Sequence, residues 1–163
     1  MRFLLLALVN VLLFGAEPAL ILHVKSNALL HVSFDNRERY CQPYGIVTLE
    51  MLMHQSRSDE ICHNALVDFY LRNPLQKHFA QRLFHTQQQY MISEFGDYCQ
   101  IRVSGKRSYA SLLLREGLAI VPQQFDDDFV AYDYRRLERD ARNSQKGIWA
   151  DPVLRNCMKM LSI

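Results

Sequence analysis

Hydrophobic and polar positions alternate along the first third of the chain. Apolar side chains recur at every second position in two short runs, Leu22 and Val24, then Leu30, Val32 and Phe34. This period of two, with a polar stretch at 25–27 between the runs, predicts a β-hairpin over residues 20–34. Residues 39–47 then predict a third strand, in which Pro43 favours an edge or a bulge.

The same alternation returns at residues 87–95 and 98–103, on either side of Gly96-Asp97. These two segments predict a pair of antiparallel strands. A short apolar run at 118–121, ended by Pro122, predicts one further buried strand.

Apolar positions three or four residues apart predict helices between and after the strands. Ser58 is expected to open one that stops at Asn73-Pro74 and buries Ile61, Ala65, Leu66 and Phe69. A shorter helix follows over 75–84, and another over 107–116 places Ala110, Leu113 and Leu114 on one face before Gly117. The last follows Asp126, Asp127 and Asp128, ends at Gly147 and buries Val130, Tyr134, Leu137 and Ala141.

Strands followed by helices predict the α+β class. Five strands with helices between them favour a small Greek-key β-barrel of the OB-fold type, with about three α-helices. The chain has 163 residues, which is enough for one domain with a substantial core and too few for two.

The first sixteen residues do not fit this domain. Arg2 precedes an apolar run from Phe3 to Phe14, and the small residues Gly15 and Ala16 follow. This order is typical of a secretory signal peptide, and the run is shorter than the roughly 20 residues of a membrane span. We therefore expect a signal peptide over 1–16, a periplasmic or secreted protein, and no integral membrane protein after cleavage; an uncleaved anchor is the alternative.

Four cysteines remain after such a cleavage, and exported proteins with an even number usually oxidise them. Sequence leaves three pairings open. Cys41 and Cys99 both lie in strand-like segments, which favours Cys41–Cys99 with Cys62–Cys157; free buried thiols are the alternative.

The formal net charge is only +2, so no strong overall field attracts nucleic acid. Local basic groups remain candidates for phosphate binding, namely Lys106-Arg107 and the arginines of the last helix, although the latter alternate with acids as on a solvated face. Aromatic residues that could stack on bases are Tyr40, Tyr44, Tyr98 and Tyr109.

Residues 104–151 carry the most specific pattern. They read S-G-K, then A-S-L-L-L-R-E-G-L-A, then a charged helix ending in Q-K-G-I-W-A-D. This order resembles the C-terminal half of the staphylococcal (thermonuclease-like) nuclease family. The resemblance implies an OB-fold domain over 17–151, with a C-terminal tail over 152–163 and an added stretch around 74–85.

The resemblance also implies where catalytic residues should lie, and here the chain departs from the family. The first-hairpin turn carries Lys25 and Asn27 where the family has acids. The third strand reads Q-P-Y-G-I-V-T-L-E over 42–50, with Gln42 in an arginine position and Val47 in a metal-acid position. Asp97 stands in a second arginine position. Only Glu50 matches, at the general-base position, and we expect no metal ligand set from these residues.

These observations predict an exported nuclease-like protein without catalytic activity. We expect a cell-envelope binding module for a protein partner or single-stranded nucleic acid, with no cofactor. Its candidate binding residues are Lys25, Asn27, Gln42, Tyr44, Asp97, Lys106 and Arg107. The alternative is an active secreted endonuclease that uses calcium to hydrolyse phosphodiesters, with Glu50 as its base.

Overall fold

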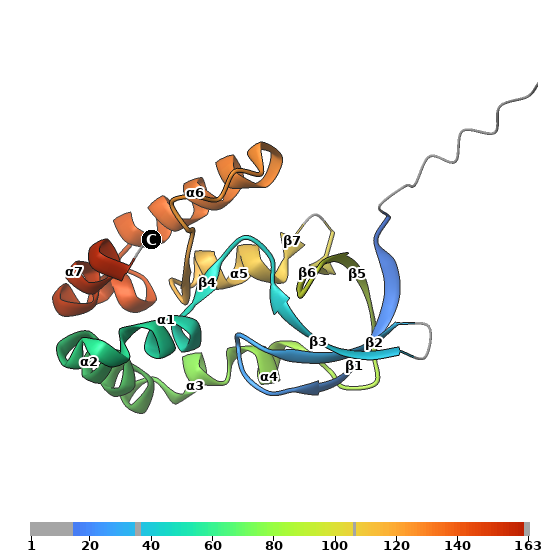
Figure 1. Cartoon of the computed structure of the whole chain (residues 1–163), viewed down its shortest axis with the longest axis horizontal. Coiled ribbons are helices and arrows are strands. Elements are labelled where there is room, and N and C mark those ends of the chain that lie inside the picture. The colour runs from blue at the N-terminus through green and yellow to red at the C-terminus, as the bar shows by residue number, and fades with distance from the viewer. Residues whose placement is uncertain (1–14, 35–36, 106, 162–163) are drawn as a thin grey trace, which may run out of the picture.

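Five strands close into a barrel in the computed structural model, which describes residues 15–34, 37–105 and 107–161. The strands are β1 (Glu17–Val24), β2 (Leu30–Phe34), β3 (Arg37–Pro43), β5 (Gln89–Phe95) and β6 (Tyr98–Ser104). They follow the order β3-β2-β1-β5-β6, with antiparallel neighbours throughout, and a parallel pairing of β3 with β6 closes the ring. This mixed barrel with its helices confirms the predicted OB-fold-like α+β class (Figure 1).

The predicted third strand is wrong beyond Pro43. Gly45 has φ of 75° and turns the chain there, and the ring of Phe125 occupies the place where a Cβ would stand. Residues further on form a separate short strand, β4 (Val47–Thr48), which pairs with β8 (Ala119–Ile120). A further short strand, β7 (Arg107–Ser108), pairs with the end of β6.

The connection between β3 and β5 is helical, and its first helix was not predicted. Its elements are α1 (Leu49–Gln55), the 3-10 turn η1 (Ser56–Ser58), α2 (Glu60–Arg72), α3 (Pro74–Lys77) and α4 (Phe79–Leu83). Asp59, and not Ser58, caps α2, because the Asp59 carboxylate accepts the backbone N–H of Cys62 at 3.1 Å. Leu66 and Phe69 are buried as expected, whereas Ile61 is 72% exposed and Cys62 takes the inward position.

The C-terminal part contains α5 (Tyr109–Arg115), α6 (Asp128–Asn143), the 3-10 turn η2 (Gly147–Ala150) and α7 (Pro152–Leu161). Gly117 and Gly147 hold positive φ and lie against each other, with Ile148 N donating to Gly117 O at 3.1 Å. A Cβ on either glycine would meet the backbone of the other segment. This contact explains why both predicted helix ends carry glycine. The stretch 152–163, expected as a tail, contains the whole of α7, which buries Leu154, Cys157 and Met158.

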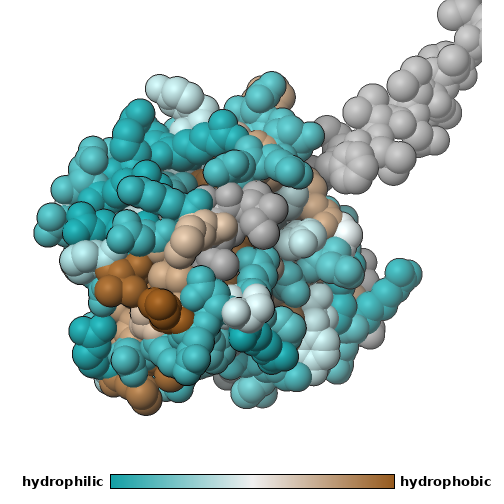
Figure 2. Space-filling view, turned by 60° about the vertical axis from the view of Figure 1, so that its left-hand side comes forward, coloured by the Kyte–Doolittle hydropathy of each residue, from teal (hydrophilic) through white to brown (hydrophobic). Residues whose placement is uncertain are grey.

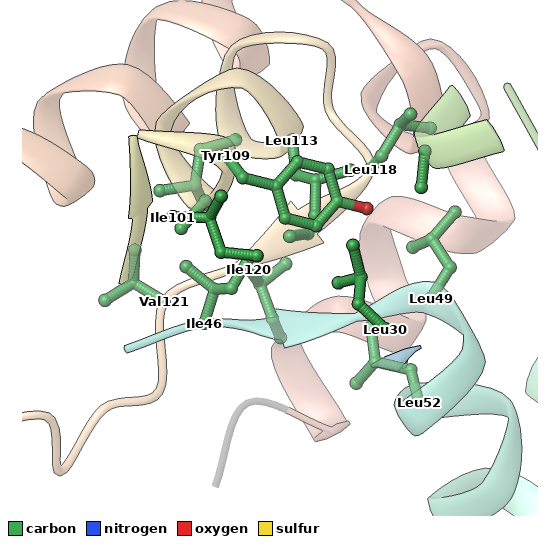
Figure 3. Close-up of a cluster of buried hydrophobic side chains, with 14 of the residues drawn as sticks. Leu30, Ile46, Leu49, Leu52, Ile101, Tyr109, Leu113, Leu118, Ile120 and Val121 are labelled. Atoms are coloured by element: carbon green, nitrogen blue, oxygen red, sulfur yellow. The ribbon is translucent and has the colours of Figure 1, made fainter. Parts of the chain in front are cut away.

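One core joins the barrel to the helices. Figure 3 shows Tyr109, Leu113 and Leu118 packed over Leu30 and Ile46, with Leu49 and Leu52 of α1 beside them. Ala110, Leu113 and Leu114 are buried as predicted, and so are Tyr134 and Ala141 of α6, while Val130 and Leu137 are only partly buried. Burial of these side chains is the main force that holds the two parts together.

Two disulfides connect distant elements. Cys41–Cys99 joins β3 to β6 where the barrel closes, and Cys62–Cys157 joins α2 to α7. These are the two pairs favoured from the sequence. Where the chain is described, no helix combines the length and apolar character that a bilayer crossing requires. The predicted signal peptide lies almost entirely outside the described residues.

Candidate functional site

Glu50 lies at the first turn of α1 and points toward the β1–β2 turn. Its Oε1 accepts the backbone N–H of Asn27 at 3.1 Å, while Oε2 is buried and has no hydrogen-bond partner among the described residues. Burial raises the pKa of the Glu50 carboxyl, and the Asn27 N–H and the nearby Tyr70 and Thr48 hydroxyls only partly offset this rise. The group is therefore an interior carboxyl whose ionisation is less favourable than that of an exposed glutamate.

Asn27 is fully buried, so its side chain is not placed to meet a ligand. Its Oδ1 accepts Ala80 N at 2.9 Å, and its Nδ2 donates to Gln76 O at 3.0 Å and Lys77 O at 3.3 Å. Its carbonyl accepts the hydroxyl of Tyr109 at 2.9 Å. These bonds tie the β1–β2 turn to α3, α4 and α5, which is a structural role.

The carboxylates do not converge around Glu50. Within the described residues, no three His, Cys, Asp or Glu side chains come together so that they could hold a metal ion. Hard divalent cations need several oxygen ligands, and Val47 and Asn27 offer no carboxylate beside Glu50. The interior cluster can hold or release a proton at Glu50, but its own side chains do not form a cation site.

The outer face of β3 carries a different arrangement. Because side chains alternate along a strand, Cys41 and Pro43 point inward, and Tyr40, Gln42 and Tyr44 point outward. Tyr40 stacks on His31 of β2 with ring centroids 4.8 Å apart, and Lys25 Nζ lies 4.3 Å from the centre of the Tyr40 ring. The Lys25 ammonium and the rings of His31 and Tyr40 are therefore in contact at one end of this face.

Tyr44 forms the second half of the face. Its ring stacks on Phe95 at 4.2 Å and meets the edge of Phe125 at 5.5 Å. Its hydroxyl donates to Asp127 Oδ2 at 3.1 Å, and partial burial together with this carboxylate raises the pKa of the Tyr44 phenol. The exposed ring of Tyr98 stands opposite Phe95 in the β5–β6 hairpin. We call Tyr40, Gln42, Tyr44, Phe95 and Tyr98 the β3 face.

The structure brings several of the predicted binding residues to this face. Gln42 N donates to Asp97 O at 3.1 Å, so Gln42, Tyr44 and the Asp97 turn lie together, and Lys25 joins them through Tyr40. Arg107 lies at the opposite end of β6, about 20 Å along the strand from Tyr98. Lys106 falls outside the described residues. Tyr109, a candidate stacking residue, is 1% exposed and belongs to the core.

Charges of both signs lie near the β3 face. Arg39 is on the side of β3 that carries Cys41, where it pairs with Glu94 Oε2 at 3.0 Å and donates to Gly96 O. Asp97, between β5 and β6, and Asp126, before α6, are exposed. A groove of 460 Å³, lined in part by Phe34, Arg37, Arg39, Glu94 and Phe95, adjoins the face. The face is thus aromatic and mixed in charge, and not a basic channel.

Sequence reasoning missed three aromatic members of this arrangement, His31, Phe95 and Phe125. Phe95 and Tyr98 flank the predicted Gly96-Asp97 turn, so they stand opposite each other if the turn joins two paired strands. This position was the available signal for Phe95. Phe125 is far from β3 in the chain and has no such signal.

Neither comparison with known proteins assigns this chain to a group. No protein-family model matches it, and no curated protein is significantly similar to it.

Proposed function

We propose that this chain is an exported, non-catalytic domain of thermonuclease-like ancestry that binds a protein partner through the β3 face. One observation carries the proposal: Tyr40 and Gln42 point outward from β3, and Tyr44 just after it stacks on Phe95, which stands opposite Tyr98, the neighbour of Gln42. The corresponding strands and loops of OB-folds are a common ligand surface.

Exposed aromatic side chains favour a protein partner. Tyr40, Phe95 and Tyr98 are 46%, 37% and 41% exposed, and tyrosine and phenylalanine are enriched at protein interfaces. Paired and mixed charges around them give polar contacts without a strong field. Single-stranded nucleic acid is the second candidate, because the Lys25–Tyr40 pair offers a cation beside a stacking ring.

The lack of catalytic activity is proposed from the surroundings of Glu50. Hydrolysis of a phosphodiester needs a cation held by several oxygens, a base, and positive charge near the phosphorus oxygens. The resemblance assigns these roles to positions that hold Lys25, Asn27, Gln42, Val47 and Asp97. Of these, Asn27 is occupied by internal hydrogen bonds, and Lys25 lies over Tyr40. Two disulfides support export, since such bonds persist in oxidising compartments.

A nuclease assay tests the catalytic part of the proposal. The mature protein is incubated with plasmid and with denatured DNA in calcium, in magnesium and in chelator, and we expect no cleavage above a mock purification. Cleavage that needs a metal ion and disappears in Glu50→Gln would reject the proposal in favour of the active endonuclease.

Site-specific photo-crosslinking tests the binding part. A benzophenone side chain replaces Tyr98 on the β3 face or, as a control, Met91 of β5, which has a similar exposure of 38%. In the envelope fraction of the source organism we expect a discrete crosslinked protein from position 98 and none from position 91. Equal crosslinking from both positions counts against the β3 face. Crosslinking to an oligonucleotide only, with affinity that falls steeply with salt, identifies nucleic acid as the ligand.

A further inference from the structure

A second hollow lies on the helical side of the molecule, and no residue of the β3 face is among its described lining residues. Its volume is 530 Å³, within the range of small-molecule sites, and it lies between the segment 120–123, α6 and α7. Apolar side chains of Ile120, Val121 and Met158 line it together with the ring of Trp149. Figure 2 shows the surface of this helical end, where apolar side chains interrupt a mostly hydrophilic face.

Positive side chains outnumber negative ones in this hollow. Among the described residues, Arg135, Arg142 and Lys159 line it, against the carboxylate of Glu138. That carboxylate is already engaged, because its Oε1 pairs with Arg142 Nη2 at 3.0 Å and its Oε2 accepts Val121 N at 3.2 Å. The same pairing partly neutralises Arg142. Arg135 Nη2 donates to Phe125 O at 3.1 Å and to Gln123 O at 3.4 Å, and these carbonyl oxygens leave the Arg135 charge available to an entering anion.

Trp149 adds a hydrogen-bond donor without a partner. The residue is 2% exposed, and its Nε1 is buried with no hydrogen-bond partner among the described residues. An indole N–H can only donate, and a buried donor without an acceptor is unfavourable. The guanidinium of Arg142 lies over the indole, 4.4 Å from its centre, and the Arg142 side chain is itself 52% exposed. An anion that pairs with Arg142 can draw it off the ring and bring an oxygen to the N–H.

We propose that this hollow binds a small organic anion, a carboxylate or phosphate monoester with an apolar body. The anionic oxygens pair with Arg142 and Arg135 and accept from Trp149 Nε1, and the apolar body packs on Val121, Met158 and the indole. This site is separate from the β3 face and does not depend on the function proposed for it.

The chain offers a direct reporter, because Trp149 is its only tryptophan. The disulfide-intact mature protein is titrated with benzoate, octanoate and phenyl phosphate, with inorganic phosphate and benzyl alcohol as partial probes, and indole fluorescence is recorded. We expect a saturable change with the organic anions, and at least about tenfold weaker binding of benzyl alcohol, which lacks the charge. The proposal is overturned if none of the organic anions saturates up to about 10 mM, where a Kd corresponds to only about −3 kcal/mol. It is also overturned if inorganic phosphate binds as tightly as phenyl phosphate.

Two arginine variants test the placement. Arg142→Gln removes the cation over the indole, and Arg139→Gln removes one from the same helix that does not line the hollow. We expect Arg142→Gln to weaken organic-anion binding by about tenfold or more, and Arg139→Gln to change it by less than about twofold. If both variants weaken organic-anion binding equally, the binding depends only on general surface charge, and the proposed site is rejected. Trp149→Phe, followed by calorimetry because the reporter is lost, should also weaken binding; circular dichroism checks that each variant is folded.

Discussion

The inner and outer sides of the β1–β2 turn have different roles. Asn27 turns inward, is fully buried and uses its amide and carbonyl to hold α3, α4 and α5. Lys25, two residues earlier, turns outward and lies over Tyr40 of the β3 face. One turn that the resemblance marks as a single catalytic element is thus divided between core structure and surface.

The same division separates Glu50 from the residues around the β3 face. Burial raises the pKa of the Glu50 carboxyl, whereas Glu94 is partly exposed and ion-paired with Arg39. The inner side is a buried hydrogen-bond network, which stabilises the fold, and the outer side carries exposed aromatic and charged groups, which suit recognition. We therefore expect substitutions on the inner side to change stability and those on the outer side to change binding.

Removal of the disulfide under the β3 face should lower stability more than the single substitutions in the β1–β2 turn. Cys41 lies between Tyr40 and Gln42 and points inward to Cys99, 58 residues away in the chain. The double variant Cys41→Ala/Cys99→Ala should lose about 4 kcal/mol of unfolding free energy, because the unfolded chain regains the freedom of that loop. Denaturant unfolding under non-reducing conditions measures it. A loss below about 1 kcal/mol would mean that the β3–β6 closure does not depend on the bond.

Asn27→Ala should destabilise by about 3 kcal/mol, because it leaves several buried groups without partners. Lys25→Ala on the same turn is the matched control, with an expected change of about 0.5–1 kcal/mol from the lost cation–π contact. Urea unfolding of both variants gives the comparison. Similar losses in the two variants would remove the distinction between the inner and outer sides of the turn.

The barrel was predictable because its signals are local. Alternation over 20–34 and 87–103 gave the strands their register, and Gly96 and Gly117 marked turns that need positive φ. Helix α1 was missed because its seven residues follow directly on a segment with strand character. Leu49, Met51 and Met53 continue the period of two from Val47, although Leu49 and Leu52 are the pair that the helix buries. Short elements of this kind are decided by tertiary packing.

The site was less predictable because burial at 25–27 has no local signal. Alternation places Lys25 and Asn27 on the same side of an ideal strand, but the chain has already left β1 at Val24. Asn27 is buried only because α3 and α4 offer backbone groups to its amide. Similarly, Ile61 was expected inside and is exposed, because α7 packs on the side of α2 that carries Cys62.

The charge on Glu50 should make the stability of the protein depend on pH. Its pKa is raised in the folded state, so below about pH 4 the carboxyl is protonated in both states and its contribution to stability is complete. As the pH rises, the unfolded state ionises first, and stability falls until the pH passes the folded-state pKa. Glu50→Gln does not titrate and keeps an acceptor for Asn27 N.

The difference in unfolding free energy between Glu50→Gln and the unsubstituted protein should therefore shift in favour of the variant from pH 4 to pH 7. The shift amounts to about 1.4 kcal/mol for each unit by which the pKa is raised. Urea unfolding at pH 4, 5.5 and 7 measures it. A trend of opposite sign would mean that the folded protein stabilises the Glu50 carboxylate. That result would supply the ionised base that a hydrolytic site requires, and would move Glu50 from the structural side of the comparison to the catalytic one.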